Sequence, residues 1–383
     1  MKPKMIEYYP EGKLMNKPEN KFQISSLQGL MDAQQEGTML EARAIVCDSS
    51  HNLIVELGSI RGIIPREEGA IGIKEGTVRD IAIISRVNKP VCFIVEDFMK
   101  DSDGNLIPIL SRRAAQERCM QNYINKLIPG DIINAKITHL DSFGAFADIG
   151  CGIVSLLPID SISVSRIDHP RERFSVGMDI RTIIKNKDNG RITLSHKELL
   201  GTWEENAEQF SIGETVAGVI RSVEDYGAFV ELAPNLAGLA ETHTNIEAGQ
   251  QASVYIKNII PSRMKIKLII IDAFMSDRTP TLPEYFYQGT HIDRFQYSPE
   301  SFHRTIINTV CHSGHALFHM VLFQTVAKRW ACILKSSIRM KKRMRIRLCR
   351  YRLIKCIHNK GIIIMRADFI RNNPAVAQIK NRT

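Results

Sequence analysis

The chain has 383 residues, of which 44% are hydrophobic and 24% charged, a composition typical of a soluble globular protein with two or three domains. Its net charge of +10 is unevenly distributed, because residues 301–383 hold 18 Lys or Arg against the single acid Asp368. That region carries +17, which leaves −7 for residues 1–300 and argues against a strongly basic surface there.

Targeting and membrane-spanning segments are not expected. Residues 1–21 are polar, and the longest apolar stretch, residues 316–327, is interrupted by His319 and Gln324. The eight cysteines form no CxxC pair, so we expect reduced thiols in a cytoplasmic protein. Cys311, His315 and His319 follow an i, i+4, i+8 spacing, but without a second ligand pair we expect no metal.

The first module is predicted to follow a leader, residues 1–36, which is poorly structured apart from a short helix near residues 24–35. The module itself covers residues 37–113. Its expected strands lie at residues 40–47, 51–57, 78–87, 91–97 and 106–110, with a hairpin turn at residues 101–105.

Two further modules follow at a fixed spacing. A linker helix is predicted at residues 114–129, the second module at 130–196, a second linker helix at 197–212 and the third module at 213–271. Gly130 and Gly213, which open the two modules, are 83 residues apart, and so are their most similar strands. A constant offset over tens of residues indicates a repeated module.

The repeated strand carries aromatic residues in an unusual place. Phe143, Gly144, Ala145, Phe146 recurs as Tyr226, Gly227, Ala228, Phe229. The period of two puts Ala145, Ala147 and Ile149 in the core and points Phe146 and Asp148 outward, and it does the same for Phe229 and Glu231. One such ring is commonly covered by a neighbouring loop, but two copies in phase favour an exposed stacking platform.

The predicted fold is mainly β. Five short strands in about 60 to 70 residues, separated by turn signals, indicate a small closed antiparallel barrel. We therefore expect three tandem five-stranded OB-fold barrels joined by short helices, with a basic C-terminal tail. In such barrels the second and third strands form the ligand face, where the aromatic residues fall.

The second module resembles the S1 RNA-binding domain. The resemblance rests on Gly130 with Asp131, on the strand 143–146, and on the closing run Gly190 to Ser195. The third module is similar through Gly213, Glu214, Tyr226 to Val230, and Lys265 in place of the closing arginine. Three tandem copies resemble short bacterial proteins of the ribosomal protein S1 family, which implies S1-type barrels, RNA binding and a role in translation.

The chain departs from the family pattern at several positions. The family often has a histidine after the third strand, where this chain has Pro65, Pro158 and Glu241. The first module also has Ile54 and His51 in place of the two aromatic residues. The resemblance therefore implies that the first module docks on a protein partner such as the small ribosomal subunit.

The predicted RNA site combines stacking rings with nearby cations. Bases stack on aromatic rings with little preference for one base, and Lys or Arg neutralise phosphates. Asp148 and Glu231 are expected on the outer face beside the rings, where each would orient a base or a basic side chain. The predicted RNA-binding residues are Phe143, Phe146, Arg166, Arg171, Arg191, Tyr226, Phe229, Lys257 and Lys265.

The last two segments differ in character. Residues 272–299 are rich in aromatic residues and proline and predict an extended strap packed against the third module or a partner. In the tail, residues 300–383, the run 339–352 is dense in Lys and Arg. It is consistent with a basic arm for RNA, an amphipathic membrane-surface segment, or an appended stretch without a selected fold.

The sequence thus predicts a non-catalytic protein that binds single-stranded RNA in translation. It has no phosphate-binding P-loop, GxSxG or HExxH motif, so we expect neither enzymatic activity nor a cofactor. The alternative is an adaptor whose barrels contact proteins and tether an RNA-decay or transcription enzyme.

Overall fold

The computed structural model describes residues 8–188, 190–241, 246–276 and 280–309. The chain divides into two units, residues 1–312 and 313–383, and all the described residues belong to the first. The run 339–352 and the residues Cys311, His315 and His319 lie outside the described residues. Among those described, no helix is long and apolar enough to cross a membrane.

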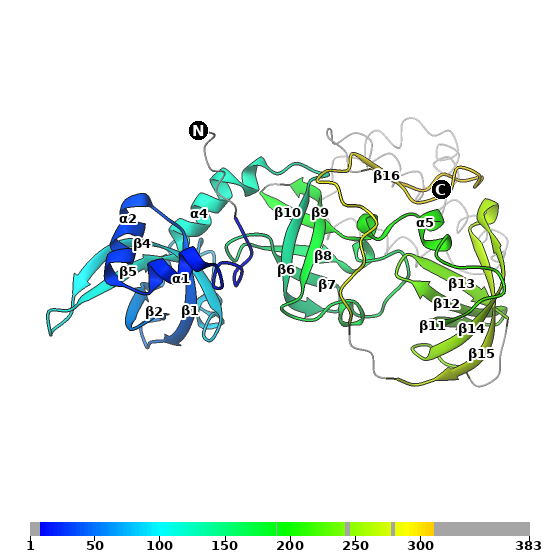
Figure 1. Ribbon diagram of the computed structural model, residues 1–383, viewed down its shortest axis with the longest axis horizontal. Coiled ribbons are helices and arrows are strands. Elements are labelled where there is room, and N and C mark those ends of the chain that lie inside the picture. Colours follow the sequence, from blue (N-terminus) through cyan, green and yellow to red (C-terminus); the bar gives the residue numbers. More distant parts are fainter. Residues whose placement is uncertain (1–7, 189, 242–245, 277–279, 310–383) are drawn as a thin grey trace, which may run out of the picture. The chain divides into compact units, whose positions relative to one another are not determined.

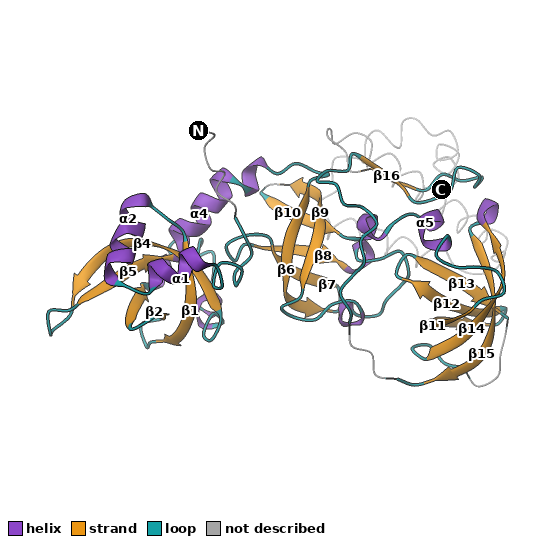
Figure 2. Ribbon diagram, viewed as in Figure 1, coloured by secondary structure: helices purple, strands orange, loops and turns teal. Residues whose placement is uncertain are grey.

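The predicted mainly β fold is confirmed: the described residues form three closed five-stranded barrels (Figures 1 and 2). The first barrel has the strand order β1-β2-β3-β5-β4. Its strands are β1 (Leu40–Cys47), β2 (Leu53–Leu57), β3 (Ile60–Ile64), β4 (Pro90–Lys100) and β5 (Leu106–Ser111). Their inward side chains, among them Val55, Phe93 and Leu110, form the core.

Two expectations for this region were wrong. The short helix expected near residues 24–35 is present as α2 (Leu27–Glu36), but the described part of the leader before it is not poorly structured, because it contains α1 (Pro18–Ile24). Ser26 caps α2 through its side chain, and Gly37 ends it at φ +63. The strand expected at residues 78–87 is replaced by the short helix α3 (Ile81–Ile84), because the carbonyl of Asp80 accepts bonds from the amides of Ile83 and Ile84 and Ile83 turns into the core.

The second barrel has the order β10-β8-β7-β6-β9. It follows α4 (Arg112–Asn122), whose N-cap is Ser111, and the 3-10 helix η2 (Ile124–Lys126). Its strands are β6 (Ile132–Asp141), β7 (Gly144–Asp148), β8 (Val154–Pro158), β9 (Asp179–Asp188) and β10 (Arg191–Ser195). Two 3-10 helices, η3 (Ile159–Ser161) and η4 (Pro170–Glu172), lie between β8 and β9.

The third barrel has the order β11-β12-β13-β15-β14. Its strands are β11 (Thr215–Glu224), β12 (Gly227–Ala233), β13 (Leu236–Ala240), β14 (Gln251–Ile260) and β15 (Lys265–Phe274). The single linker helix expected at residues 197–212 is instead two short helices, η5 (Lys197–Leu200) and α5 (Trp203–Ala207). Gly201 separates them at φ +83, a backbone conformation that a continuous helix cannot contain.

The strap returns from the third barrel to the second. The amide of Phe286 donates to Leu199 O, and the amides of Ile132 and Ile292 bond to Thr290 O and Gly130 O. The chain then reaches the third barrel again, where the Tyr297 hydroxyl donates to Asn235 O at 2.6 Å. Within the strap, β16 (Arg294–Gln296) pairs with β17 (Ile307–Thr309), which follows the strap. The strap is therefore bonded to both barrels.

Candidate nucleic-acid interface

The two aromatic pairs have the same geometry. The Phe143 and Phe146 ring centroids are 5.8 Å apart at an interplanar angle of 88°, and those of Tyr226 and Phe229 are 6.3 Å apart, also at 88°. Phe143 is 51% exposed and Tyr226 66%, while Phe146 and Phe229 are half-buried. Each pair thus holds one ring edge-on against another and leaves an aromatic face open to solvent.

The strands around each pair fix this geometry. A Cβ on Gly144 would lie 2.5 Å from Leu157 O, and one on Gly227 would overlap Ala240 O. Only glycine therefore lets the third strand of the barrel approach the start of the aromatic strand. The alternation places Ala145 and Ala228 in the cores and turns the phenylalanines outward.

The strand register identifies corresponding positions in all three barrels. A break in register after Ala44, Ile137 and Ile220 leads to the pairs Val46 with Ile54, His139 with Phe146, and Ser222 with Phe229. Ile54 therefore occupies the position of the two phenylalanines. The row of side chains continues across two more strands, as Ile63 and Ile109 in the first barrel, Leu156 and Thr193 in the second, and Leu239 and Lys267 in the third.

His139 joins the aromatic pair of the second barrel, which the sequence analysis missed. Its exposed ring lies 6.0 Å from that of Phe146, at an interplanar angle of 33°. The signal available in the sequence was its outward phase on the strand that precedes the aromatic one. The second barrel thus presents three rings, and the third presents two.

The predicted cations are all exposed, but they differ in setting. Arg191 and Lys265 begin β10 and β15, the strands that carry Thr193 and Lys267 of the row. Lys257 lies on β14 and is paired with Glu241 at 3.0 Å. Arg171 lies in η4 and Arg166 in the loop before it, and in the described part of the chain neither forms an ion pair.

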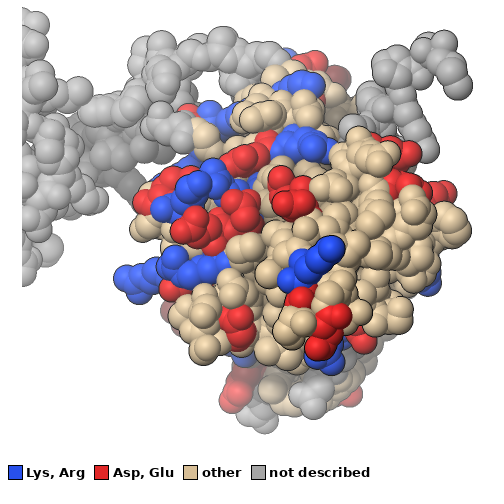
Figure 3. Space-filling view, turned by 90° about the vertical axis from the view of Figure 1, so that its left-hand side faces the viewer, with Lys and Arg blue, Asp and Glu red and all other residues tan. Residues whose placement is uncertain are grey.

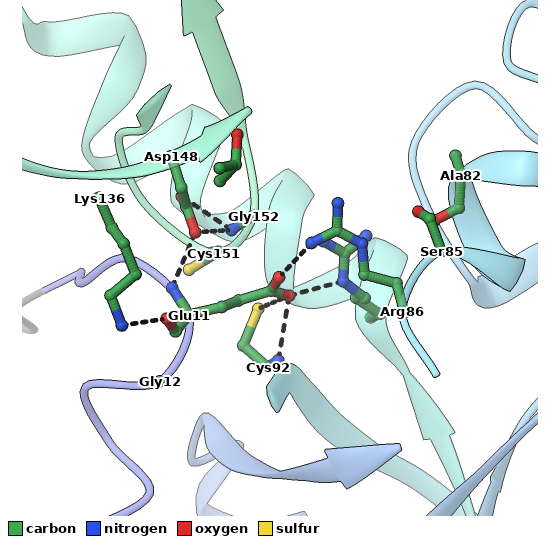
Figure 4. Close-up of polar contacts among 12 residues, drawn as sticks. Glu11, Gly12, Ala82, Ser85, Arg86, Cys92, Lys136, Asp148, Cys151 and Gly152 are labelled. Carbon is green, nitrogen blue, oxygen red and sulfur yellow. Dashed lines mark hydrogen bonds and ion pairs between the residues drawn. The ribbon is translucent and has the colours of Figure 1, made fainter. Parts of the chain in front are cut away.

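Asp148 and Glu231 do not lie on the open outer face where they were expected, although Glu231 binds basic side chains as expected. They are only 2% and 4% exposed. Figure 4 shows that the Asp148 carboxylate accepts a bond from the amide of Glu11 at 2.8 Å and one from Gly152 at 3.0 Å. Burial raises the pKa of Asp148 to about 7. The outward phase was right, but the segment containing Glu11 covers that face.

Glu11 itself connects the first barrel to the second. Its carboxylate is 2.7 Å from Arg112 Nε and 3.1 Å from Arg86 Nη1, and its backbone carbonyl accepts a bond from Lys136 Nζ at 3.0 Å (Figure 4). Burial opposes ionisation of Glu11, but the charge of Arg112 prevails and lowers its pKa. This acid is therefore a structural element of the junction.

Glu231 connects the second barrel to the third in a similar way. Its Oε2 is 2.6 Å from Arg173 Nη2 and 2.8 Å from Arg221 Nε, and Arg221 also pairs with Glu172. Arg173 comes from the loop of the second barrel, and Arg221 from β11 of the third. These charges compensate one another and are not available to phosphates.

The face drawn in Figure 3 is not strongly basic, in agreement with the net charge of −7 of residues 1–300. On the face drawn in Figure 3, Lys and Arg are interspersed with Asp and Glu, and no single sign dominates.

Three tandem closed barrels, two of which carry an outward phenylalanine on the second strand, define a class of protein: tandem OB-fold barrels. Residues 126–197, which include all five strands of the second barrel, match the S1 RNA binding domain.

Among curated proteins the chain is similar to small ribosomal subunit protein bS1. It is 30% identical to that of Leuconostoc lactis over 251 residues, which is 61% of this chain and 56% of the relative. It is 32% identical to that of Staphylococcus aureus (strain COL) over 236 residues, 57% of this chain and 58% of the relative. The chain thus spans little more than half the length of these relatives.

A solved multidomain protein with nucleic acid binding domains from Streptococcus pneumoniae aligns with 62% of this chain and 74% of its own, at 12% identity and a TM-score of 0.21.

Proposed function

We propose that the chain binds single-stranded RNA, without catalysis, and acts in translation in the cytoplasm as a bS1-like protein. The observation that carries this proposal is the pair of matching platforms, Phe143 with Phe146 and Tyr226 with Phe229. An exposed ring beside a half-buried one gives a base a flat surface on a rigid support. Stacking of this kind contributes roughly 1–3 kcal/mol per base and accepts any base.

The junction between the second and third barrels supports a joint binding unit. Arg173, Glu231 and Arg221 tie the barrels together, and the strap is bonded to both. Ile183 of the second barrel is also buried in the hydrophobic cluster of the third. A strand of RNA held by one platform would meet the second at high effective concentration.

The experiment is a titration of the full chain with unstructured RNA at several salt concentrations, comparing wild type with the double variant Phe146→Ala, Phe229→Ala. Loss of about 1 kcal/mol or more per ring predicts at least a 30-fold weaker affinity, on the order of 2 kcal/mol in total. Ile54→Ala is the matched control, because it truncates the corresponding position of the first barrel. It should leave the affinity unchanged.

Two outcomes contradict the proposal. If the double variant binds RNA as tightly as wild type, with a steep salt dependence, binding resides in the basic residues of the tail and not in the rings. If wild type binds no RNA, the adaptor function becomes the better account.

For the first barrel we propose contact with a protein, such as one on the small ribosomal subunit. Its row consists of Val46, Ile54, Ile63 and Ile109, so it offers aliphatic side chains where the other barrels offer rings. Val46 is exposed and the other three are half-buried. The variant Val46→Glu should reduce co-sedimentation with small ribosomal subunits and leave the affinity for free RNA unchanged. Unchanged co-sedimentation together with weaker binding of free RNA would refute this assignment.

A further inference from the structure

The outward side chains of the fourth strand are buried in the first two barrels and exposed in the third. In β4 the side chains of Val91, Phe93 and Val95 belong to the core of the first barrel. The alternate side chains, Cys92 and Ile94, are buried in the hydrophobic cluster of the second barrel. In the first barrel this strand therefore serves two cores, its own and that of the next barrel.

The second barrel repeats this arrangement and the third does not. Ile94 pairs with Ser111, Ile183 with Ser195, and Tyr255 with Ile269, so the three pairs correspond. Ile183 is fully buried in the cluster of the third barrel, together with Trp203 of α5. Tyr255, at the same position, is 38% exposed.

The cross-strand partner of this residue, on the last strand of each barrel, explains why a helix follows that strand in the first two barrels and not in the third. Ser111 ends β5, and its hydroxyl accepts the amide of Ala114 in the first turn of α4, which begins at Arg112. Ser195 ends β10 and donates to Glu198 at 2.6 Å in η5. Ile269 has no polar group to start a helix, and β15 continues for five more residues, to Phe274.

The result is an apolar surface, here called the terminal strip: Tyr255, Ile269, Ile271 and Phe274, all exposed. Tyr255 and Ile269 are cross-strand partners, and Ile271 and Phe274 continue the outer side of β15. Contiguous apolar side chains of this kind mark an interaction surface. In the first two barrels the corresponding surface is covered by the helix that leads into the next barrel.

The chain also contains the other half of this repeated contact. α4 leads into the second barrel, η5 and α5 lead into the third, and α1 and α2 lead into the first. Phe22 of α1 lies 15 residues before Gly37, and Ala115 of α4 lies 15 residues before Gly130. Ala115 is buried in the cluster that covers Ile94, whereas Phe22 is 77% exposed.

We propose that the terminal strip of one chain binds the α1–α2 segment of a second copy, so that the series of barrels continues from chain to chain. The interface is heterologous, because two different surfaces of the same chain meet in it, and such contacts build open chains of subunits. The interface buries Phe22 against Tyr255 and Ile271 and repeats the order barrel, leading helix, barrel that the chain already shows twice.

The test is sedimentation velocity of the full chain, free of RNA, over a series of concentrations. Wild type should form species larger than dimers as concentration rises. Phe22→Ser disrupts the exposed surface of the α1–α2 segment and Ile271→Asp disrupts the terminal strip, and each variant alone should remain monomeric. Val176→Asp, an exposed apolar residue of the second barrel, is the control and should associate like wild type.

Mixing the two variants gives the decisive measurement. The Phe22→Ser chain keeps its terminal strip, and the Ile271→Asp chain keeps the surface of its α1–α2 segment. The mixture should therefore form a dimer and nothing larger. A wild-type chain that stays monomeric at every concentration overturns the proposal. A second pattern also overturns it: Ile271→Asp abolishes association, Phe22→Ser leaves it intact, and mixing the two variants does not restore it. That pattern indicates a symmetric dimer in which two terminal strips bind each other. Circular dichroism and melting temperature confirm that each variant is folded.

Discussion

Asp148 and Glu231 occupy the same position in two successive barrels, 83 residues apart, and both are buried where their barrel meets another part of the chain. Asp148 accepts the amide of Glu11, and Glu231 binds the guanidinium of Arg173. The corresponding residue of the first barrel, Glu56, is exposed. This acid is therefore buried at the two junctions between successive barrels and exposed in the first barrel.

Removal of the Glu231 charge should weaken the second junction. In Glu231→Gln the guanidinium of Arg173 loses its charged partner and that of Arg221 keeps only Glu172, in a site that is largely buried. Breaking a buried pair from one side costs about 3–5 kcal/mol. Denaturant unfolding should show a loss of that order, while Glu224→Gln, at an exposed position of β11, should stay within about 0.5 kcal/mol of wild type. Equal effects of the two substitutions would contradict the assignment.

The first junction should depend on Glu11 in the same way. Glu11→Gln leaves Arg112, which is buried, without its charged partner at 2.7 Å. We expect a loss of about 3 kcal/mol or more in the free energy of unfolding. Glu19→Gln, in the first turn of α1, provides the control. A junction that tolerates Glu11→Gln as well as it tolerates the control does not rest on this ion pair.

The strap should hold less firmly as pH rises. His291 Nδ1 lies 2.7 Å from Asp131, and Nε2 lies 3.1 Å from Asp293. The hydrogen bond with Asp131 is the main cause of the raised pKa of His291. Because the folded-state pKa lies above the unfolded-state value, the stabilisation is complete below about pH 6.5 and is lost as pH rises through the raised pKa.

The measurement is the melting temperature at a series of pH values from about 5.5 to 8.5, a range that brackets this titration. Wild type should lose stability relative to His291→Gln as pH increases. His303→Gln, a substitution of an exposed histidine, should follow wild type. Parallel curves for wild type and His291→Gln would show that the imidazole does not act through its charge.

His139 should add to the affinity of the second barrel for RNA, and a histidine at the corresponding position of the third barrel should do the same there. His139→Ala removes the ring beside Phe146 and should weaken RNA binding several-fold, by roughly 1 kcal/mol. Ser222→His puts a ring at the corresponding position of the third barrel and should strengthen binding. Val46→His, at the same position of the first barrel, should have no effect because that barrel lacks a platform.

Much of the fold could be predicted because the sequence repeats at a fixed offset. The alternation in strands β7 and β12 was sufficient to orient Phe146 and Phe229 outward and Ala147 and Val230 inward. The alternation says which side of a strand a residue faces, but not what covers that side. For this reason Asp148 and Glu231 were expected in solvent, although distant segments bury them.

Local composition failed where a single backbone conformation decided the structure. The segment 197–212 has the composition of one helix, yet the left-handed Gly201 divides it. At Asp80 a hydrogen-bonded turn replaced an expected strand in a sequence rich in isoleucine. His139 was missed because one histidine on a strand is unremarkable until its partner ring is known.

The route of the strap has a consequence for synthesis of the protein. Asp131, at the start of the second barrel, bonds to His291, which emerges 160 residues later. All five strands of the second barrel and all five of the third leave the ribosome before that contact forms. Domains generally fold in the order in which they are made, but here the second barrel cannot complete this edge until the third has been synthesised. A nascent chain interrupted between residues 274 and 290 would carry a second barrel in which residues 130–132 lack their hydrogen bonds to the strap.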